Sequence, residues 1–220
     1  MAETVSGKRS IVQLILAPAL ITLVVTVLRL EGEVHHWGSP WFNNSPGGGG
    51  AIVGISWLPI IFGPYFALKL AGSGEEPSSY GKAFATTLGG LAAMVLGGFV
   101  LFKSGNSAAL AILGFVLALV AAFIARTGWR SLGSTLIAYA FAARIPVLIV
   151  MFFAMSAGWG THCDAVEARF ATAPLWTKFF YEAFLPQMMV WIGYTAVVGS
   201  LCGEIVAPIF ARKPVVQPAT

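Results

Sequence analysis

Charged side chains are scarce in this chain. Asp, Glu, Lys and Arg make up only 10% of the 220 residues, whereas 57% of the residues are hydrophobic. A soluble globule of this length needs more polar surface than these residues supply. The composition therefore excludes an ordinary soluble domain. The net charge of +4 gives no reason to expect a nucleic-acid partner, because the basic residues lie mainly beside the ends of apolar runs.

Cysteine and histidine, the residues most used for redox chemistry and metal binding, are also few, with two Cys and three His in the whole chain. Cys163 precedes the last apolar run and Cys202 lies near its far end. The two thiols are therefore expected on opposite sides of a membrane, too far apart for a disulfide.

The chain also lacks the short motifs of the common membrane-embedded enzymes. It has no Gly-x-Ser-x-Gly, no His-Glu-x-x-His, no paired aspartates within apolar runs and no histidine inside them. The four glycines at 47–50 are not followed by Gly-Lys-Ser/Thr, so they do not form a phosphate-binding loop. These absences favour a protein without catalytic activity and give no indication of a cofactor.

What the chain does have is six long apolar runs. Each is about 18 residues or more, close to the length a helix needs to cross the roughly 30 Å hydrocarbon core of a bilayer. The sequence therefore predicts an all-α, multi-pass membrane protein, a single domain over residues 1–220. Its six expected spans are 11–30, 51–70, 83–102, 108–126, 132–156 and 179–210.

The basic residues predict the orientation of these spans. Eight would lie on the side of the N-terminus and four on the other, which fits the positive-inside bias if both termini are cytoplasmic. The first set is Lys8, Arg9, Lys69, Lys82, Arg126, Arg130, Arg212 and Lys213, and the second is Arg29, Lys103, Arg169 and Lys178. The absence of long soluble regions indicates a bacterial inner (cytoplasmic) membrane.

Proline and glycine distinguish individual spans. Pro59 and Pro64 interrupt the second span, and Pro146 interrupts the fifth, so both helices are expected to kink and to leave carbonyls without donors. The third span is rich in small residues, which predicts close helix packing and a central place in the bundle.

Arg144 is the most unusual residue, because it lies in the middle of the fifth span. A guanidinium at that depth costs at least about 2.5 kcal/mol unless it is paired or hydrated. Its expected partners are on the sixth span: Gln187, Tyr194 and Glu204. Two interpretations follow. Arg144 either holds helices together, or it binds an anionic head group or substrate in a central cavity, with these three residues completing the site.

A second group of polar residues is expected at the outer face. All three histidines fall on that side, together with several acidic residues, and imidazole and carboxylate are common ligands of zinc, copper and iron. The candidate metal ligands are His35, His36, His162 and Asp164. A solvated polar cap is the simpler interpretation of the same residues.

Three functions therefore remain open. The first is a non-catalytic accessory, assembly or scaffold subunit, with the lipid bilayer and other membrane subunits as partners. The second is a small transporter or lipid-handling protein with an anion-binding cavity around Arg144, in keeping with the proline-interrupted helices that inverted-repeat transporters use. The third is a metal-dependent enzyme at the outer face, which requires the first and last outer loops to meet.

Overall fold

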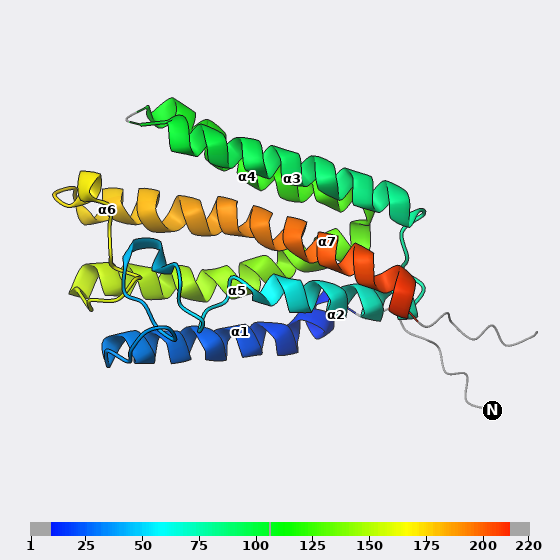
Figure 1. The fold of residues 1–220 in the computed structure, drawn as a ribbon, viewed down its shortest axis with the longest axis horizontal. Coiled ribbons are helices and arrows are strands. Elements are labelled where there is room, and N and C mark those ends of the chain that lie inside the picture. The colour runs from blue at the N-terminus through cyan, green and yellow to red at the C-terminus, as the bar shows by residue number, and fades with distance from the viewer. Residues whose placement is uncertain (1–9, 106, 212–220) are drawn as a thin grey trace, which may run out of the picture.

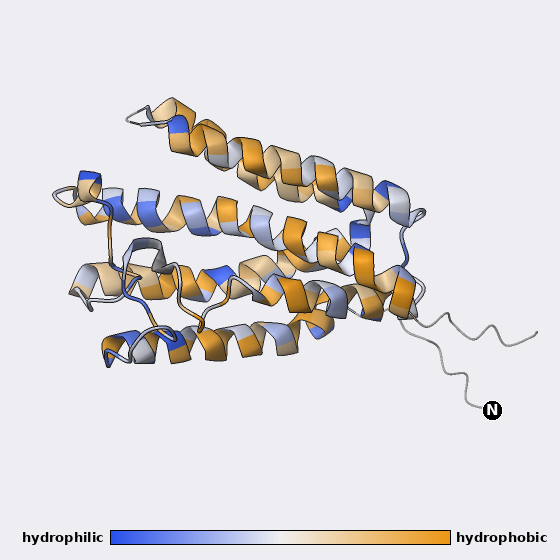
Figure 2. Cartoon of the chain, viewed as in Figure 1, coloured by the Kyte–Doolittle hydropathy of each residue, from blue (hydrophilic) through white to orange (hydrophobic). Residues whose placement is uncertain are grey.

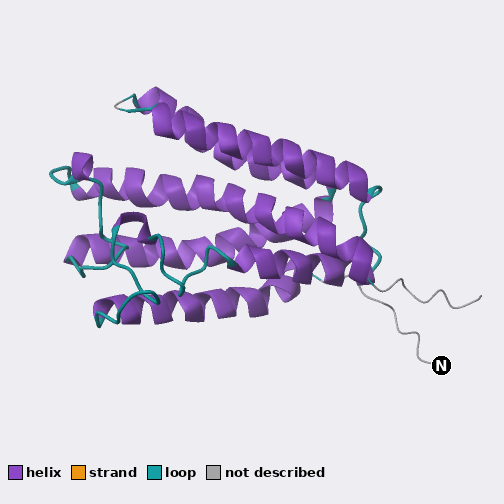
Figure 3. Ribbon diagram, in the orientation of Figure 1, coloured by secondary structure: helices purple, strands orange, loops and turns teal. Residues whose placement is uncertain are grey.

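The computed structural model describes residues 10–105 and 107–211 (Figure 1). Within these residues all regular structure is helical and no strand occurs (Figure 3), which confirms the all-helical prediction. Four of the basic residues used to predict orientation lie outside the described residues: Lys8, Arg9, Arg212 and Lys213.

Five helical segments are long and apolar enough to cross a membrane. They are α1 (Ile11–Val34), α3 (Tyr80–Lys103), α4 (Ala108–Gly128), α5 (Arg130–Ala157) and one continuous segment from Leu175 to Phe210. That last segment begins as α6 (Leu175–Lys178), passes through two π-helical stretches (Phe179–Phe184 and Pro186–Val190) and ends as α7 (Trp191–Phe210). Hydrophobic residues cover most of the length of these helices (Figure 2).

The second apolar run differs from the other five. Its helix, α2, comprises only Leu58–Gly72, and residues 51–57 before it have no regular helical structure. Pro59 is the second residue of α2, in the first turn, where a missing N–H costs no hydrogen bond, so the helix begins beside this proline and is not broken by it. As a result α2 begins well inside the bundle (Figure 1).

Serine side chains define where several helices begin. Ser10, Ser79 and Ser107 each accept a hydrogen bond from a backbone N–H in the first turn of α1, α3 and α4. At the other end of α5, Gly158 ends the helix with a φ of 68°, a left-handed conformation that glycine adopts without steric cost.

The helix at the centre of the bundle is α7, which contacts α2, α3, α4 and α5. The prediction that the third span would be central is wrong, because α3 packs mainly against α4 and lies at the edge of the bundle (Figure 1). Its small residues serve that hairpin: a methyl group at Gly97 would lie 2.8 Å from the carbonyl oxygen of Gly114. The small residues of α7 serve the contact with α2, where Gly63 lies against the backbone of Gly199.

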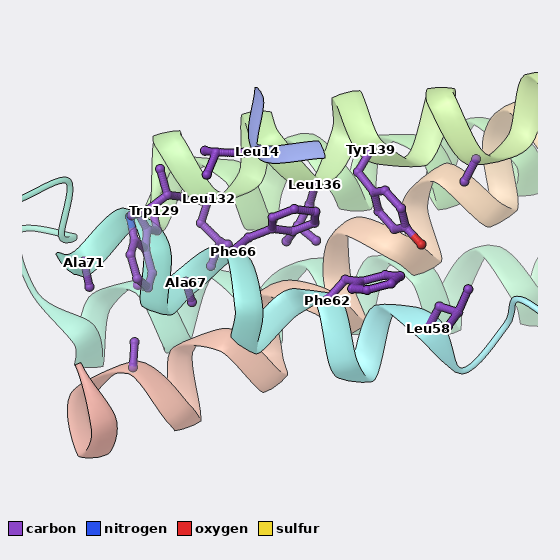
Figure 4. Close-up of a cluster of buried hydrophobic side chains, with 14 residues drawn as sticks. Leu14, Leu58, Phe62, Phe66, Ala67, Ala71, Trp129, Leu132, Leu136 and Tyr139 are labelled. Carbon is purple, nitrogen blue, oxygen red and sulfur yellow. The ribbon is translucent and has the colours of Figure 1, made fainter. Parts of the chain in front are cut away.

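The largest buried cluster lies between α2 and α5, with contributions from α1 and α7 (Figure 4). Phe62 and Phe66 of α2 pack against the ring of Tyr139 of α5 at centroid distances of 5.4 and 5.5 Å. The Tyr139 hydroxyl is 2.7 Å from the hydroxyl of Thr22, which joins α5 to α1. These contacts fix α1, α2 and α5 relative to one another, and α1 and α5 both line the cavity beside Arg144.

Candidate functional site

Arg144 lies near the middle of α5 and is 4% exposed. Its Nη1 donates a hydrogen bond of 3.2 Å to Oε1 of Gln187, and its guanidinium carbon lies 4.3 Å from the ring centroid of Trp191. Its Nε has no hydrogen-bond partner among the described residues. The structure therefore leaves one donor of a deeply buried cation without a protein acceptor, although such groups are normally satisfied.

Gln187 is held in an orientation that suits Arg144. While its Oε1 accepts from Arg144, its Nε2 lies 3.6 Å from Sδ of Met151, seven residues after Arg144 on α5. Gln187 itself is buried, in the second π-helical stretch. Both ends of the amide are thus in contact with α5, and its acceptor is directed to the guanidinium.

A cavity of about 440 Å³ lies beside Arg144. This volume is within the range of sites for small organic ligands, roughly 300 to 1,000 Å³. Its lining comes from α1, residues 46–56 before α2, α5, the loop after α5, the π-helical stretches and Trp191 at the start of α7. The polar and charged residues among them are Thr26, Arg29, Ser56, Arg144, His162, Glu167, Glu182 and Gln187.

The irregular segment at 51–57 forms part of the cavity wall. Its backbone is held by hydrogen bonds from Ile52 N–H to the Pro40 carbonyl and from Val53 N–H to the Trp41 carbonyl, both 3.1 Å. A side chain at Gly54 would lie 2.9 Å from Nη1 of Arg29, so this segment passes close to the guanidinium of Arg29. At membrane depth, non-helical backbone is stable where it is buried in protein or faces a wet cavity, and this segment meets that condition.

A buried carboxylate closes the end of the bundle that carries the loops. Glu33, with no exposed surface, accepts hydrogen bonds from Arg29 Nε at 2.8 Å and from the backbone N–H of His162 at 2.9 Å, and its Oε2 is 2.5 Å from His162 Nδ1. Asn44 donates to the carbonyls of both Glu33 and Gly160. The first and last loops therefore meet over the cavity and are joined through α1.

Cys163, next to His162, also faces the cavity but is 4% exposed. Its Sγ is almost equidistant from the two ring nitrogens of His162, at 3.8 and 3.9 Å. Burial raises the pKa of the Cys163 thiol to about 12, and the negative charge of Glu33 adds to the effect. Because a thiol with this pKa stays protonated at neutral pH, Cys163 is not a ready nucleophile.

The residues predicted around Arg144 are only partly brought together. Gln187 bonds Arg144 directly, and Tyr194 packs edge-to-face on Trp191, the ring beneath the guanidinium, at 5.4 Å. Glu204 does not reach this site: it lies 17 residues beyond Gln187, about 25 Å along a helix. Its Oε1 accepts a hydrogen bond from Thr87, and its Oε2 has no partner among the described residues.

The predicted metal ligands are not brought together. Asp164 accepts hydrogen bonds from the Gly160 and Thr161 backbone within its own turn, His35 faces Glu31 at 3.4 Å, and His162 is held by Glu33. His36, the fourth predicted ligand, is exposed. Over residues 10–105 and 107–211, no three His, Cys, Asp or Glu side chains converge as a metal site. The two outer loops do meet, but through a carboxylate and an imidazole already bonded to each other.

Sequence reasoning missed Trp191, Glu182 and the role of Glu33. The spacing of Arg29 and Glu33, four residues apart on a helix, was a usable signal for their ion pair. Glu182, to which the sequence analysis assigned no role, lines the cavity. No local pattern indicates this, because its position depends on the π-helical register of residues 179–190.

Comparison of the chain with protein-family models, with curated proteins and with solved structures finds no match. Functional inference therefore depends on the geometry of the cavity.

Proposed function

We propose that this chain is a small membrane protein that binds an anionic small molecule or lipid head group in the cavity beside Arg144, as a transporter or a lipid-handling protein. The observation that carries the proposal is the 4% exposed Arg144 with its Nε unpartnered beside a cavity of about 440 Å³. A structural arginine would be expected to pair with a protein carboxylate, and Arg144 has no ion pair among the described residues.

The membrane arrangement that goes with this function has six embedded helical segments, α2 being the short sixth, and both termini in the cytoplasm of a bacterial cell. The positive-inside bias supports it: Lys69, Lys82, Arg126 and Arg130 belong to the end of the bundle where α1 begins and α7 ends (Figure 1). In this arrangement the cavity and its two covering loops face the outer side of the inner membrane.

The broken second span supports a ligand site more than a purely structural bundle. A helix that starts inside the bundle after an irregular segment is a feature of transporter sites, where unwound backbone lines the substrate cavity. An accessory or scaffold subunit, the first function expected from the sequence, needs neither the cavity nor this irregular segment.

Binding of two anionic probes tests the proposal. We expect the purified protein to bind glycerol 1-phosphate, or phosphatidylglycerol in native mass spectrometry, and Arg144→Gln to lower the affinity at least tenfold. Arg130→Gln, a change at the exposed first residue of the same helix, away from the cavity, is the matched control and should bind as the wild type does. Thermal unfolding of each variant shows that it is folded.

Equal binding by wild type and a folded Arg144→Gln variant would overturn the proposal and favour the accessory or scaffold role. If Arg144→Gln does not fold, Arg144→Lys keeps the charge but loses the planar group that donates to Gln187 and stacks on Trp191. We expect this variant to fold and to bind the probes more weakly, and unchanged affinity would count against the site.

A further inference from the structure

The π-helical register brings an acidic residue into the cavity of Arg144. Glu182, Gln187 and Trp191 all line this cavity. Gln187 follows Glu182 by five residues and Trp191 follows it by nine. In an α-helix with 3.6 residues per turn, Glu182 and Trp191 would point to nearly opposite sides. The wider helix at 179–190, with hydrogen bonds from residue i to i+5, places them on one face. π-helical segments of this kind recur at functional sites.

Two charged residues that line the cavity form no ion pair with another described residue. Arg29 is paired with Glu33, and Arg169 is paired with Glu167, each at 2.8 Å. Arg144 and Glu182 have no oppositely charged side chain within 4.0 Å among the described residues, and they do not pair with each other. Arg169 acts on Glu182 only from beyond that distance. Arg144 and Glu182 are therefore the two charged residues of the cavity that lack a directly paired counter-ion among the described residues.

From these two charges we infer that the ligand is a zwitterion of the phosphoethanolamine kind, with its phosphate at Arg144 and its ammonium group at Glu182. The inference rests on the proposed function and specifies its substrate class. A purely anionic ligand would be attracted by Arg144 but repelled by the Glu182 carboxylate, which lies close to the backbone of Glu167 in the same cavity. A ligand with both charges satisfies both side chains.

The separation of the two charges favours phosphoethanolamine over an α-amino acid. Glu182 precedes Gln187, the hydrogen-bond partner of Arg144, by five residues, or about one turn of the π-helical segment, so the two charges enter the cavity from different turns. An α-amino acid carries its ammonium and carboxylate on one carbon, whereas phosphoethanolamine separates its charges by two carbons and an oxygen. The same chemistry occurs free and as the head group of phosphatidylethanolamine, and a cavity of about 440 Å³ accommodates the head group rather than a whole lipid.

The test compares ligands that differ in the ammonium group. The free pair is phosphoethanolamine and glycerol 1-phosphate, measured by calorimetry, and the lipid pair is phosphatidylethanolamine and phosphatidylglycerol, measured by native mass spectrometry. We expect the wild type to prefer the ammonium member of a pair at least tenfold. We expect Glu182→Gln to abolish this preference while it keeps or improves binding of the glycerol compounds. Glu76→Gln, a change at a carboxylate in the loop between α2 and α3, is the control and should retain the preference.

The outcomes separate this inference from the proposed function. If the wild type binds both members of each pair equally, and Glu182→Gln changes nothing, the zwitterion is wrong while the anion site stands. If no probe binds to the wild type, the proposed function fails as well. Preference within the lipid pair alone supports the inference with a lipid head group as the source, and preference within the free pair supports it with a soluble compound as the source.

Discussion

The guanidinium carbon of Arg144 on α5 lies 4.3 Å from the ring centroid of Trp191 on α7. The cation is therefore stabilised by the face of an aromatic ring and by the Gln187 amide, without a carboxylate. Among the described residues, no carboxylate lies within ion-pair distance of Arg144, so the aromatic ring and the amide are the groups that offset the cost of its burial.

Replacing Trp191 should weaken this support. We expect Trp191→Leu to lower the free energy of unfolding by about 1 to 2 kcal/mol, in the range of a desolvated cation–π contact, and Trp191→Phe to have a smaller effect. Trp41→Leu, at a tryptophan that is 56% exposed, serves as the control. Chemical unfolding in detergent measures the difference, and a Trp191→Leu variant as stable as the wild type would show that the stacking contributes nothing.

Glu33→Gln should destabilise the protein by about 3 kcal/mol, since removing one partner of a buried ion pair leaves the other charge uncompensated. Glu33 has no exposed surface and bonds both Arg29 and His162. Two residues earlier, the side chain of Glu31 is 56% exposed and meets only His35, so Glu31→Gln is the matched control. Loss of stability of similar size in both variants would contradict the role given to Glu33.

The thiol of Cys163 should resist alkylation in the folded protein. Burial raises the pKa of the Cys163 thiol to about 12, so the folded protein has little thiolate at pH 8.5. Iodoacetamide at that pH should therefore modify Cys163 only after denaturation, when the thiol recovers an ordinary pKa of about 8.5. Mass spectrometry of the peptide containing Cys163 reports the reaction. Rapid modification of the folded protein at that pH would contradict the burial of this thiol.

The raised pKa of Cys163 should also make the stability of the protein depend on pH at high pH. Because the folded pKa lies above the unfolded one, the contribution of Cys163 is complete below about pH 8.5 and is lost as the pH rises toward 12. Unfolding measurements on wild type and Cys163→Ala should therefore converge or cross as the pH is raised through this window. A constant difference between the two would contradict the shift.

Gly63→Ala tests the contact between α2 and α7. A methyl group at Gly63 would overlap the backbone of Gly199, and overpacking of this kind typically costs about 1 to 3 kcal/mol. Gly98→Ala on α3 is the control, because nothing lies within 4 Å of the added carbon. It should leave stability unchanged or slightly higher, since alanine favours a helix. Equal unfolding curves for the two variants would show that α2 and α7 can move apart at no cost.

The apolar runs alone predict the membrane class and the helical structure of this chain, because a long segment without polar side chains has no other stable arrangement in a bilayer. They also single out Arg144, since a cation is costly at that depth wherever its neighbours lie. The late start of α2 could not be read in the same way, because residues 51–57 are as apolar as a helix would be and differ only in what they pack against.

The tertiary structure alone decided which polar groups share the cavity. Gln187 reaches Arg144 and Glu204 does not, because the two residues lie 17 residues apart on the continuous segment from Leu175 to Phe210, although both were plausible partners by sequence pattern. Glu182 and Trp191 face the same cavity only through a π-helical register that leaves no signature in the residue types. Hydrophobicity is a property of each residue and can be read locally, whereas the pairing of charges depends on helix register and on contacts between distant segments, which only the folded chain fixes.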